Sequence, residues 1–440
     1  MARAAEPPSG TRDFLAEEVR RRKAAFDTIG AVFERYGFDP LETPAFERLE
    51  VFAGKLGDEA SALIFKILKR GVHEATGEAD LALRYDHTVP LARVVGTYGS
   101  TLPSPYKRYT LGPVWRADRP AKGRFREFAQ CDIDTVGSAS PLADAEIIWA
   151  VHDSLAALGI EDFQFLVNSR QALHGLLQAY SIAPELGAKV LGSLDKLDKT
   201  TPKAVTAELL NRGLALNTAE SLVADVTAPD TDRVRKQLDT TERGRHGLAE
   251  VDRLLELTAG LPAGRVVFTP RMVRGLDYYT GPIFEVTATG YPGSIASGGR
   301  YDGLVAQLGG PDVPACGGSI GIERILATQA VAAPADQRGL DVALTVLGAQ
   351  ADIMRLAGEI RALGLRAGVY LGSSGKLARQ LQWANDQHAR SVVIYGPEEQ
   401  KTGEVTVRDM ESGEQTRVPL TETAAHFRSA AARPPDRDGR

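Results

Sequence analysis

Cysteine is scarce in this sequence of 440 residues, which contains only Cys131 and Cys316. Two cysteines cannot build a disulfide framework or a cysteine-rich zinc site, so we expect both to be reduced and buried. The seven histidines lack the H-x-x-H and H-E-x-x-H spacings of zinc sites. The sequence therefore predicts no set of side chains dedicated to binding a metal.

Long apolar runs are also absent, because no segment approaches the ~18 consecutive apolar residues that a transmembrane helix requires. Hydrophobic residues make up 43% of the chain and charged residues 25%, which is typical of a soluble globular protein. The first ten residues, MARAAEPPSG, contain no apolar signal segment. We therefore expect a cytoplasmic protein with no membrane partner, and the length predicts about three structural units.

The phosphate-binding motifs of the commonest nucleotide folds are missing as well. The segment GSSGKL at 372–377 resembles a P-loop, but Tyr370 stands where that motif requires glycine, and Leu377 replaces its serine or threonine. If the protein uses ATP, it must bind the phosphates in another way.

The net charge of −5 argues only weakly against a polyanionic ligand, because local patches attract phosphates more than total charge does. Between residues 107 and 126 there is one acid, Asp118, and a basic cluster of seven: Lys107, Arg108, Arg116, Arg119, Lys122, Arg124 and Arg126. Aromatic and apolar residues interleave these charges. The pattern favours a phosphate-binding loop that lines a cleft, and a solvated charged hairpin is the alternative.

The spacing of apolar residues predicts the main elements. Helical periodicity from Phe14 to Tyr36 indicates an amphipathic helix that Gly37 ends. The segment FDPLETPAFE that follows suits an edge strand or an irregular extended segment. Residues 81–137 and 265–325 read as strands broken by glycine and proline, which favours an antiparallel sheet with flanking helices and an α+β class.

The composition and the periodicity of the sequence change at several points. Leucine- and alanine-rich helical periods interrupt the strand-rich regions, the small-residue segment AVAAPADQRG reads as a linker, and regular strand–helix alternation follows it. The predicted division is a catalytic core in two parts (1–169 and 263–329), a helical insertion (170–262), a linker (330–339), a small α/β domain (340–428) and a disordered tail (429–440).

One predicted strand carries an unusual row of polar residues. In RFREFAQCDIDTVG, strand alternation places Gln130, Asp132 and Asp134 on one face. Burying two carboxylates and an amide without a ligand is unfavourable, so the row suits a cationic or hydrogen-bonding substrate such as an ammonium or an imidazole. The alternative is that the row faces water.

Three other segments carry candidate binding groups. Asp86 and Thr88 share a face in LRYDHTVPLAR, and either could hold an α-amino group. Arg324 lies near the start of a predicted helix in GGSIGIERIL, which indicates an anion site. The stretch RGLDYYTG at 274–281 joins a cation, a carboxylate and two phenols in one strand-like segment.

Five parts of the sequence together resemble the histidyl-tRNA synthetases, a family of class II aminoacyl-tRNA synthetases. They are PSGTRDF (8–14), LRYDHTVPLAR (83–93), GPVWRADRPAKGRFREFAQCDIDTVG (112–137), RGLDYYTG (274–281) with ASGGRYDGL (296–304), and GGSIGIERI (317–325). The resemblance covers nearly the whole chain. It implies a class II antiparallel-sheet catalytic core with a helical insertion, followed by a C-terminal α/β anticodon-binding domain.

The resemblance also implies an activity. A histidine–tRNA ligase activates L-histidine with ATP and Mg²⁺ and then esterifies tRNA(His), and the helix and strand around residues 14–47 would pair two chains into a homodimer. Two alternatives remain: a non-catalytic regulatory subunit of ATP phosphoribosyltransferase, and a paralogue that passes activated histidine to an acceptor other than tRNA. The first would be expected to lack the catalytic arginines and the C-terminal domain.

The resemblance assigns roles to individual residues. The catalytic residues would be Arg116 and Arg274, which meet the α-phosphate. The histidine-binding residues would be Asp86, Thr88, Arg116, Gln130, Asp134, Arg274, Tyr278 and Tyr279, and the ATP-binding residues would be Arg116, Arg126, Glu127 and Arg324. Asp86, Thr88 and Gln130 match positions that bind the α-amino group, and Asp134 matches the carboxylate that meets the imidazole. Strict strand alternation would place Arg274 and Tyr278 on one face and Tyr279 on the other, so a bulge near Gly275 is expected if all three act. His87 is expected to be structural.

Overall fold

A computed structural model describes residues 5–52, 61–121, 123–273, 278–291, 293–327 and 339–431. The chain divides into two units, residues 1–332 and 333–440, and each is described by itself. Among the helices of these described ranges, none combines the length and the apolar character that crossing a bilayer demands.

The first helix, α1 (Ala16–Arg35), is amphipathic as predicted. Its buried residues include Ala25, Ile29, Val32 and Phe33, which fall on one face at the 3.6-residue period. The chain then leaves the helix through Gly37, whose φ of +75° suits a residue without a Cβ.

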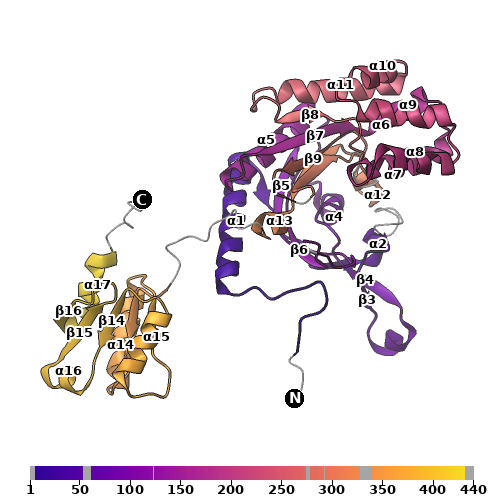
Figure 1. Cartoon of the computed structure of the whole chain (residues 1–440). Coiled ribbons are helices and arrows are strands. Elements are labelled where there is room, and N and C mark those ends of the chain that lie inside the picture. Colours follow the sequence, from indigo (N-terminus) through magenta and orange to yellow (C-terminus); the bar gives the residue numbers. More distant parts are fainter. Residues whose placement is uncertain are drawn as a thin grey trace. The chain divides into compact units, whose positions relative to one another are not determined.

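The described part of the first unit is built on an eight-stranded sheet (Figure 1). The strands in spatial order are β1 (Asp39–Pro40), β5 (Tyr106–Trp115), β6 (Glu127–Val136), β11 (Ala315–Ile320), β10 (Ala296–Arg300), β9 (Pro282–Ala288), β7 (Phe163–Ser169) and β8 (Val266–Phe268). All neighbouring pairs are antiparallel except the two at the edges, β1 with β5 and β7 with β8. The predicted antiparallel sheet, the α+β class and the edge strand after α1 are therefore confirmed.

The two faces of this sheet differ in what covers them. Helices α1, α5 (Pro141–Ala157) and α11 (Glu242–Leu257) pack on one face, where Cys131 and Ile133 of β6 join the main hydrophobic core. Both cysteines are free and buried, as expected. Helix α4 (Thr88–Tyr98) lies on the other side, inside the curve of the sheet (Figure 1). This second face carries the polar residues of the candidate site.

Smaller elements border the main sheet. A three-stranded sheet in the described residues has the order β2 (Phe46–Arg48), β4 (Ala79–Leu83) and β3 (Lys66–Leu68). The short helices are α2 (Leu49–Phe52), α12 (Leu304–Gln307), α13 (Ile322–Ala327) and a 3₁₀ turn at Gly71–Thr76.

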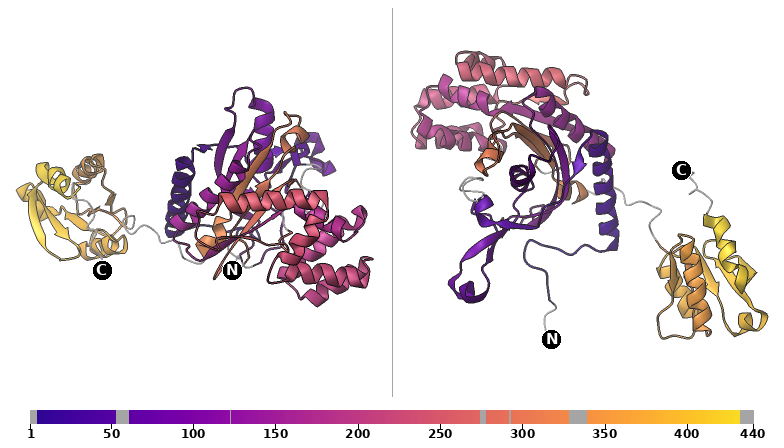
Figure 2. Two further views of the ribbon diagram at one scale, coloured as in Figure 1. Left: turned by 90° about the horizontal axis from the view of Figure 1, so that it is seen from above. Right: turned by 180° about the vertical axis from the view of Figure 1, so that it is seen from behind.

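Between β7 and β8 the chain is helical. It forms α6 (Arg170–Ala179), α7 (Pro184–Leu194), a 3₁₀ turn (Asp195–Asp198), α8 (Pro202–Asn211), α9 (Leu216–Thr227), α10 (Asp232–Asp239) and α11. Buried Leu173, Val205, Leu222 and Leu238 belong to a separate core within these helices. Figure 2 shows the helices gathered as a group at one end of the first unit.

The described residues of the second unit form a five-stranded sheet in the order β13 (Ala367–Val369), β12 (Val342–Leu344), β14 (Ser391–Ile394), β15 (Glu404–Asp409) and β16 (Gln415–Pro419). Its helices are α14 (Gln350–Ala362), α15 (Leu377–Asp386), α16 (Pro397–Thr402), a 3₁₀ turn (Leu420–Glu422) and α17 (Thr423–Ala431). The strand–helix order is the one predicted for a small α/β domain. Residues 328–338, with most of the expected linker, and 432–440, with most of the expected tail, lie outside the described residues.

Candidate active site

Two adjoining cavities open on the second face of the main sheet, with volumes of about 350 Å³ and 310 Å³. Five residues line both of them, so the two form one continuous cleft: Arg116, Gln130, Glu285, Ser297 and Ser319. We call them the amino acid cavity and the phosphate cavity after the ligands expected from the resemblance: Asp86, Asp132 and Asp134 line the first, and Arg124 and Arg324 line the second.

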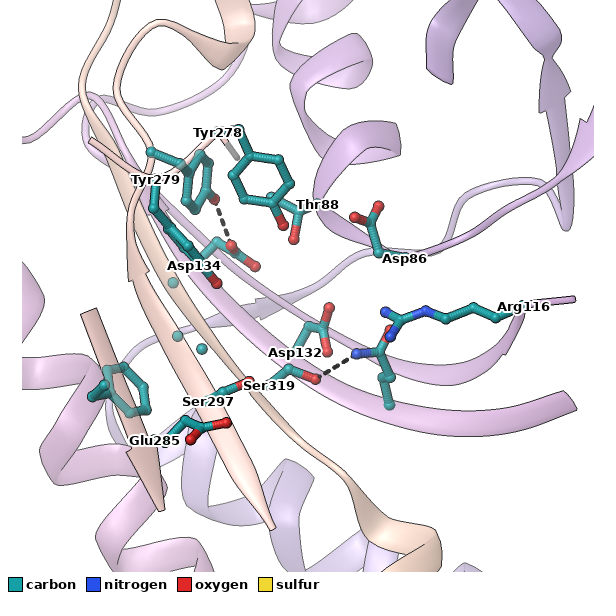
Figure 3. A pocket seen from close by; sticks show the side chains of 16 residues that line it. Asp86, Thr88, Arg116, Asp132, Asp134, Tyr278, Tyr279, Glu285, Ser297 and Ser319 are labelled. Carbon is teal, nitrogen blue, oxygen red and sulfur yellow. Dashed lines mark hydrogen bonds between the residues drawn. The ribbon is translucent and has the colours of Figure 1, made fainter. Parts of the chain in front are cut away.

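The register of the sheet builds the floor of the cleft. Glu285 of β9 lies opposite Ser297 of β10, Ser297 lies opposite Ser319 of β11, and Ser319 lies opposite Asp132 of β6. These four side chains form a polar row across four strands (Figure 3). The row lies where the two cavities meet.

The three aspartates of the described amino acid cavity lining are buried. Asp86 is 2% exposed, Asp132 is 3% exposed and Asp134 is 2% exposed, and all three line the cavity. The predicted alternation along β6 is confirmed, because Gln130 also lines the cavity while Cys131 packs into the core. The alternative that this row faces water is wrong. An acidic, enclosed cavity of this size suits a small cationic ligand.

Asp134 is fixed by two partners from distant parts of the chain. Arg108, directly opposite on β5, places its Nη2 2.8 Å from Oδ2, and the Tyr301 hydroxyl donates to Oδ1 at 2.5 Å. Burial raises the pKa of Asp134, although Arg108 and Tyr301 both favour the ionised form. Gly317 makes this arrangement possible, because a Cβ there would lie 2.0 Å from the carboxylate oxygen.

Asp86 and Asp132 keep oxygens available for a ligand. Oδ1 of Asp86 accepts the Val89 amide at 3.0 Å, and burial raises the pKa of its carboxyl. Burial also raises the pKa of Asp132 to about 7, where Arg108 opposes the shift and the neighbouring Asp134 and Asp86 add to it.

The tyrosines form the aromatic wall of the amino acid cavity. The Tyr278 and Tyr279 ring centroids lie 5.1 Å apart, and Tyr278 lies 5.8 Å from Tyr301 (Figure 3). Both Tyr278 and Tyr279 line the same cavity. The strand-like reading of this stretch is wrong for 278–281, which precede β9 and are not in a strand, so strict alternation does not separate the two rings. Gly275, where a bulge was expected, lies outside the described residues.

Arg116 occupies the junction of the cavities. Its Nε donates to the Tyr85 carbonyl at 3.1 Å, and its guanidinium lies over the Tyr85 ring at 4.2 Å and over the Phe128 ring at 5.2 Å. These contacts hold the Arg116 cation in a fixed position where it can contact a ligand in either cavity.

Arg324 lines the phosphate cavity from α13 and donates to the Ser294 carbonyl. Its neighbour Glu323 is buried between Arg12 at 2.5 Å and Arg22 at 2.7 Å and also accepts the Ala129 amide at 3.1 Å. The N-terminal segment thereby fixes the start of the helix that carries Arg324.

The remaining predicted residues lie as follows. Arg126 donates to the carbonyls of Asp118 and Ser9, and neither it nor Glu127 lines the cleft, so their assignment to ATP stays a prediction. Arg274 lies outside the described residues. His87 is buried against the Gly112 carbonyl, with a pKa lowered to about 3 by burial and nearby arginines, which agrees with a structural role.

The sequence analysis assigned no role to Glu285 and Ser319, which line the cleft, or to Arg108, which is buried and pairs with Asp134. Tyr301 was noted only within the segment ASGGRYDGL. Glu285 and Ser319 are polar residues in apolar strands, and that signal could have identified them. Arg108 was noted only as one member of the basic cluster, because its pairing with Asp134 depends on strand register.

A curved sheet of mainly antiparallel strands with a cleft on one face is the architecture that the resemblance to class II aminoacyl-tRNA synthetases implied. The family described as histidyl-tRNA synthetase matches residues 10–325, and the anticodon binding domain family matches residues 341–429. The chain belongs to the histidyl-tRNA synthetase family.

Individual relatives agree with this assignment. The histidine–tRNA ligase of Gloeobacter violaceus is 40% identical over 93% of this chain and 96% of its own, and that of Paracoccus denitrificans is 38% identical over 93% and 90%. The crystal structure of histidyl-tRNA synthetase from Nostoc sp. PCC 7120 superposes with a TM-score of 0.76 at 29% identity, covering 97% of this chain and 99% of that one. The predicted fold class and family are confirmed, histidine–tRNA ligase activity is supported, and neither alternative is favoured.

Proposed function

We propose that the cleft activates L-histidine with ATP to give histidyl-adenylate and pyrophosphate, and that the histidyl group then passes to the 3′ end of tRNA(His). The observation that carries the proposal is the junction of the two cavities at Arg116. Asp86, Asp132 and Asp134 line the cavity on one side of this cation, and Arg124 and Arg324 line the cavity on the other. An ammonium-bearing substrate would suit the first and a triphosphate the second.

In the activation step a carboxylate oxygen of histidine attacks the α-phosphorus of ATP. The new C–O–P bond forms while the bond to the pyrophosphate leaving group breaks, and negative charge builds on the α-phosphate oxygens. Arg116 would stabilise that charge, since its guanidinium is held by Tyr85 and Phe128 and needs little rearrangement. Arg274 would reach the same phosphate from the amino acid side.

Histidine recognition would use the opposite end of the cleft. Asp134 would accept a hydrogen bond from the imidazole, with Tyr278 and Tyr279 against the ring, while Asp86, Thr88 and Gln130 would hold the α-amino group. The burial of Asp134 beside Arg108 supports this role, because a buried hydrogen-bonding site rejects ligands that cannot satisfy it.

ATP would extend into the phosphate cavity, with Arg324 on its terminal phosphate. Arg126 and Glu127 would assist from the edge of the cleft. Among the described side chains no group of three or more metal ligands occurs, which suits Mg²⁺ that arrives bound to ATP phosphates. Glu285 lies at the junction and is the carboxylate that would hold the ion, which would neutralise phosphate charge.

Other parts of the chain would bind tRNA and pair two chains into a dimer. We assign catalysis to 1–169 and 263–329, the helical insertion to 170–262 and anticodon recognition to 340–428. We further propose a cytoplasmic homodimer: the reduced, buried cysteines suit a reducing compartment, and the exposed Phe46 and Tyr98 are available to a second chain.

Aminoacylation of tRNA tests the complete reaction. Purified protein with ATP, Mg²⁺ and labelled histidine should charge a tRNA(His) transcript and leave a tRNA of another identity uncharged. Formation of histidyl-adenylate without any charging of tRNA(His) would instead favour another acceptor.

A further inference from the structure

The floor of the amino acid cavity contains a carboxylate that the mechanism above does not use. Asp132 lines the cavity (Figure 3). One of its oxygens is hydrogen-bonded to the side chain of Ser319, the residue opposite it on the neighbouring strand. Its other oxygen, Oδ1, is buried and has no hydrogen-bond partner among the described residues. Such an oxygen is unfavourable unless a ligand satisfies it.

Among its described residues, the same cavity contains two further buried acceptor atoms that lack both a hydrogen-bond partner and an ion pair. Oδ2 of Asp86 and Oε1 of Gln130 are also buried and unpartnered in the part of the chain that the structure describes. Thr88 differs from them, because its hydroxyl is hydrogen-bonded to Tyr278. Oδ2 of Asp134 also has no hydrogen bond among the described residues, but Arg108 pairs with it at 2.8 Å. The buried acceptors of the described cavity lining that have neither a hydrogen bond nor an ion pair are therefore those of Asp86, Gln130 and Asp132.

These acceptors match one chemical group. An ammonium ion has three N–H donors and no acceptor, so three converging oxygens satisfy it, and carboxylates among them balance its charge. We propose that Asp132 binds the α-ammonium group of the amino acid substrate together with Asp86 and Gln130. The inference rests on the proposed function, because it adds a binding residue to the same amino acid site.

The charges around Asp132 agree with this role. The groups that act on it are Arg108 from β5, Arg84 and Asp86 before α4, Asp134 from β6, Ser319 from β11 and Tyr279. Two carboxylates and burial disfavour its ionised form, and Arg108 opposes them. A bound cation adds positive charge beside it and stabilises the carboxylate, so binding should release a proton from a fraction of the molecules at neutral pH.

The test compares two fragments of histidine. Histidinol keeps the ammonium and the imidazole, whereas 3-(imidazol-4-yl)propionate keeps the imidazole and the carboxylate but has no ammonium. For Asp132→Asn in the full chain, titration calorimetry should show histidinol affinity lowered by roughly 10- to 100-fold, the scale for a hydrogen bond to a charged group. The affinity for 3-(imidazol-4-yl)propionate should change by less than about twofold.

Two matched variants serve as controls. Asp134→Asn should weaken the binding of both ligands, since it alters the imidazole end. Asp312→Asn removes an exposed charge that does not line the cleft and should weaken the binding of neither. Thermal unfolding checks that each variant is folded, and Asp132→Ser replaces Asp132→Asn if the latter is not.

The outcomes distinguish a failure of the Asp132 assignment from a failure of the proposed function. An unchanged histidinol affinity, or an equal loss for both ligands, would overturn the assignment of Asp132 to the ammonium. If the unaltered protein binds neither histidine nor histidinol, the proposed function fails and this inference falls with it.

Discussion

At the scale of single residues, the amino acid cavity buries carboxyl groups whose ionisation is unfavourable. Asp86, Asp132 and Asp134 are buried together, and burial raises the pKa of each carboxyl. Arg108 compensates part of this charge from inside the sheet. The free protein therefore holds an arrangement that a cationic ligand would stabilise, at a cost to its own stability.

This cost predicts a pH-dependent effect of Asp132→Asn on stability. The pKa of Asp132 rises from an ordinary value of 3.8 to about 7 in the folded chain, so folding favours its protonated form. The stability that this preference contributes is present below about pH 4 and is lost as pH rises through about 7. Asparagine cannot ionise, so the variant should gain stability over the unaltered protein as pH rises.

Calorimetric scans check this prediction. The melting temperature of the variant relative to the unaltered protein should be roughly 3–6 °C higher at pH 8 than at pH 5. Saturating histidine should reduce the difference, because the ligand then stabilises the ionised Asp132. A difference that does not change with pH would contradict the burial of an ionisable Asp132.

At the scale of elements, the register of β5 against β6 fixes the histidine site. Arg108 is fully buried and lies opposite Asp134, so the pair is held by the sheet and not by flexible loops. Removing one member of a buried ion pair leaves the other uncompensated. The pair therefore connects the stability of the sheet to the shape of the site.

Replacing Arg108 by methionine should destabilise the first unit by roughly 3–5 kcal/mol at pH 8. The loss should be smaller at pH 5, where the unpaired Asp134 can take up a proton. The double variant Arg108→Met/Asp134→Asn is the control, and it should recover much of the stability. Denaturant unfolding of the unaltered protein, the single variant and the double variant measures the effect. Equal losses of stability for the single and double variants would argue against the pairing.

The sequence predicted these elements only in part, for a physical reason. Alternation along one strand is local, so the shared face of Gln130, Asp132 and Asp134 could be predicted. The pairing of Asp134 with Tyr301 joins residues 167 positions apart, and it depends on how β6, β11 and β10 align. Side-chain patterns within one segment carry no information about that alignment.

Tyr278 and Tyr279 show a second limit of prediction from the sequence. The stretch before β9 was read as strand-like, and alternation then separated Tyr278 from Tyr279. Contacts with Tyr301 and Thr88 instead hold the Tyr278 ring at the cavity, and the Tyr279 ring packs against Tyr278 in the same cavity. Tertiary packing decided the backbone here, which periodicity alone does not reveal.

At the scale of the whole molecule, two separate units divide the chain, and the cleft lies in the first. The second unit matches the anticodon binding domain family over residues 341–429. This organisation predicts that activation and tRNA recognition can be separated. A chain truncated after residue 331 should retain histidine-dependent pyrophosphate exchange but lose most tRNA charging.

The salt dependence of tRNA binding adds a second readout for the truncated chain. Removing phosphate contacts should make the slope of log affinity against log salt shallower than in the full chain. Full charging of tRNA(His) by the truncated chain would refute the assignment of anticodon recognition to the second unit.

The most direct test of the central claim is ATP–pyrophosphate exchange measured with each of the twenty amino acids. Exchange reports adenylate formation in the cleft without any need for tRNA. We predict strong exchange with L-histidine and only background exchange with the other nineteen, because a site that hydrogen-bonds the imidazole leaves buried groups unpaired when another side chain enters. Exchange that fails with histidine, or that is supported equally by another amino acid, would contradict the account.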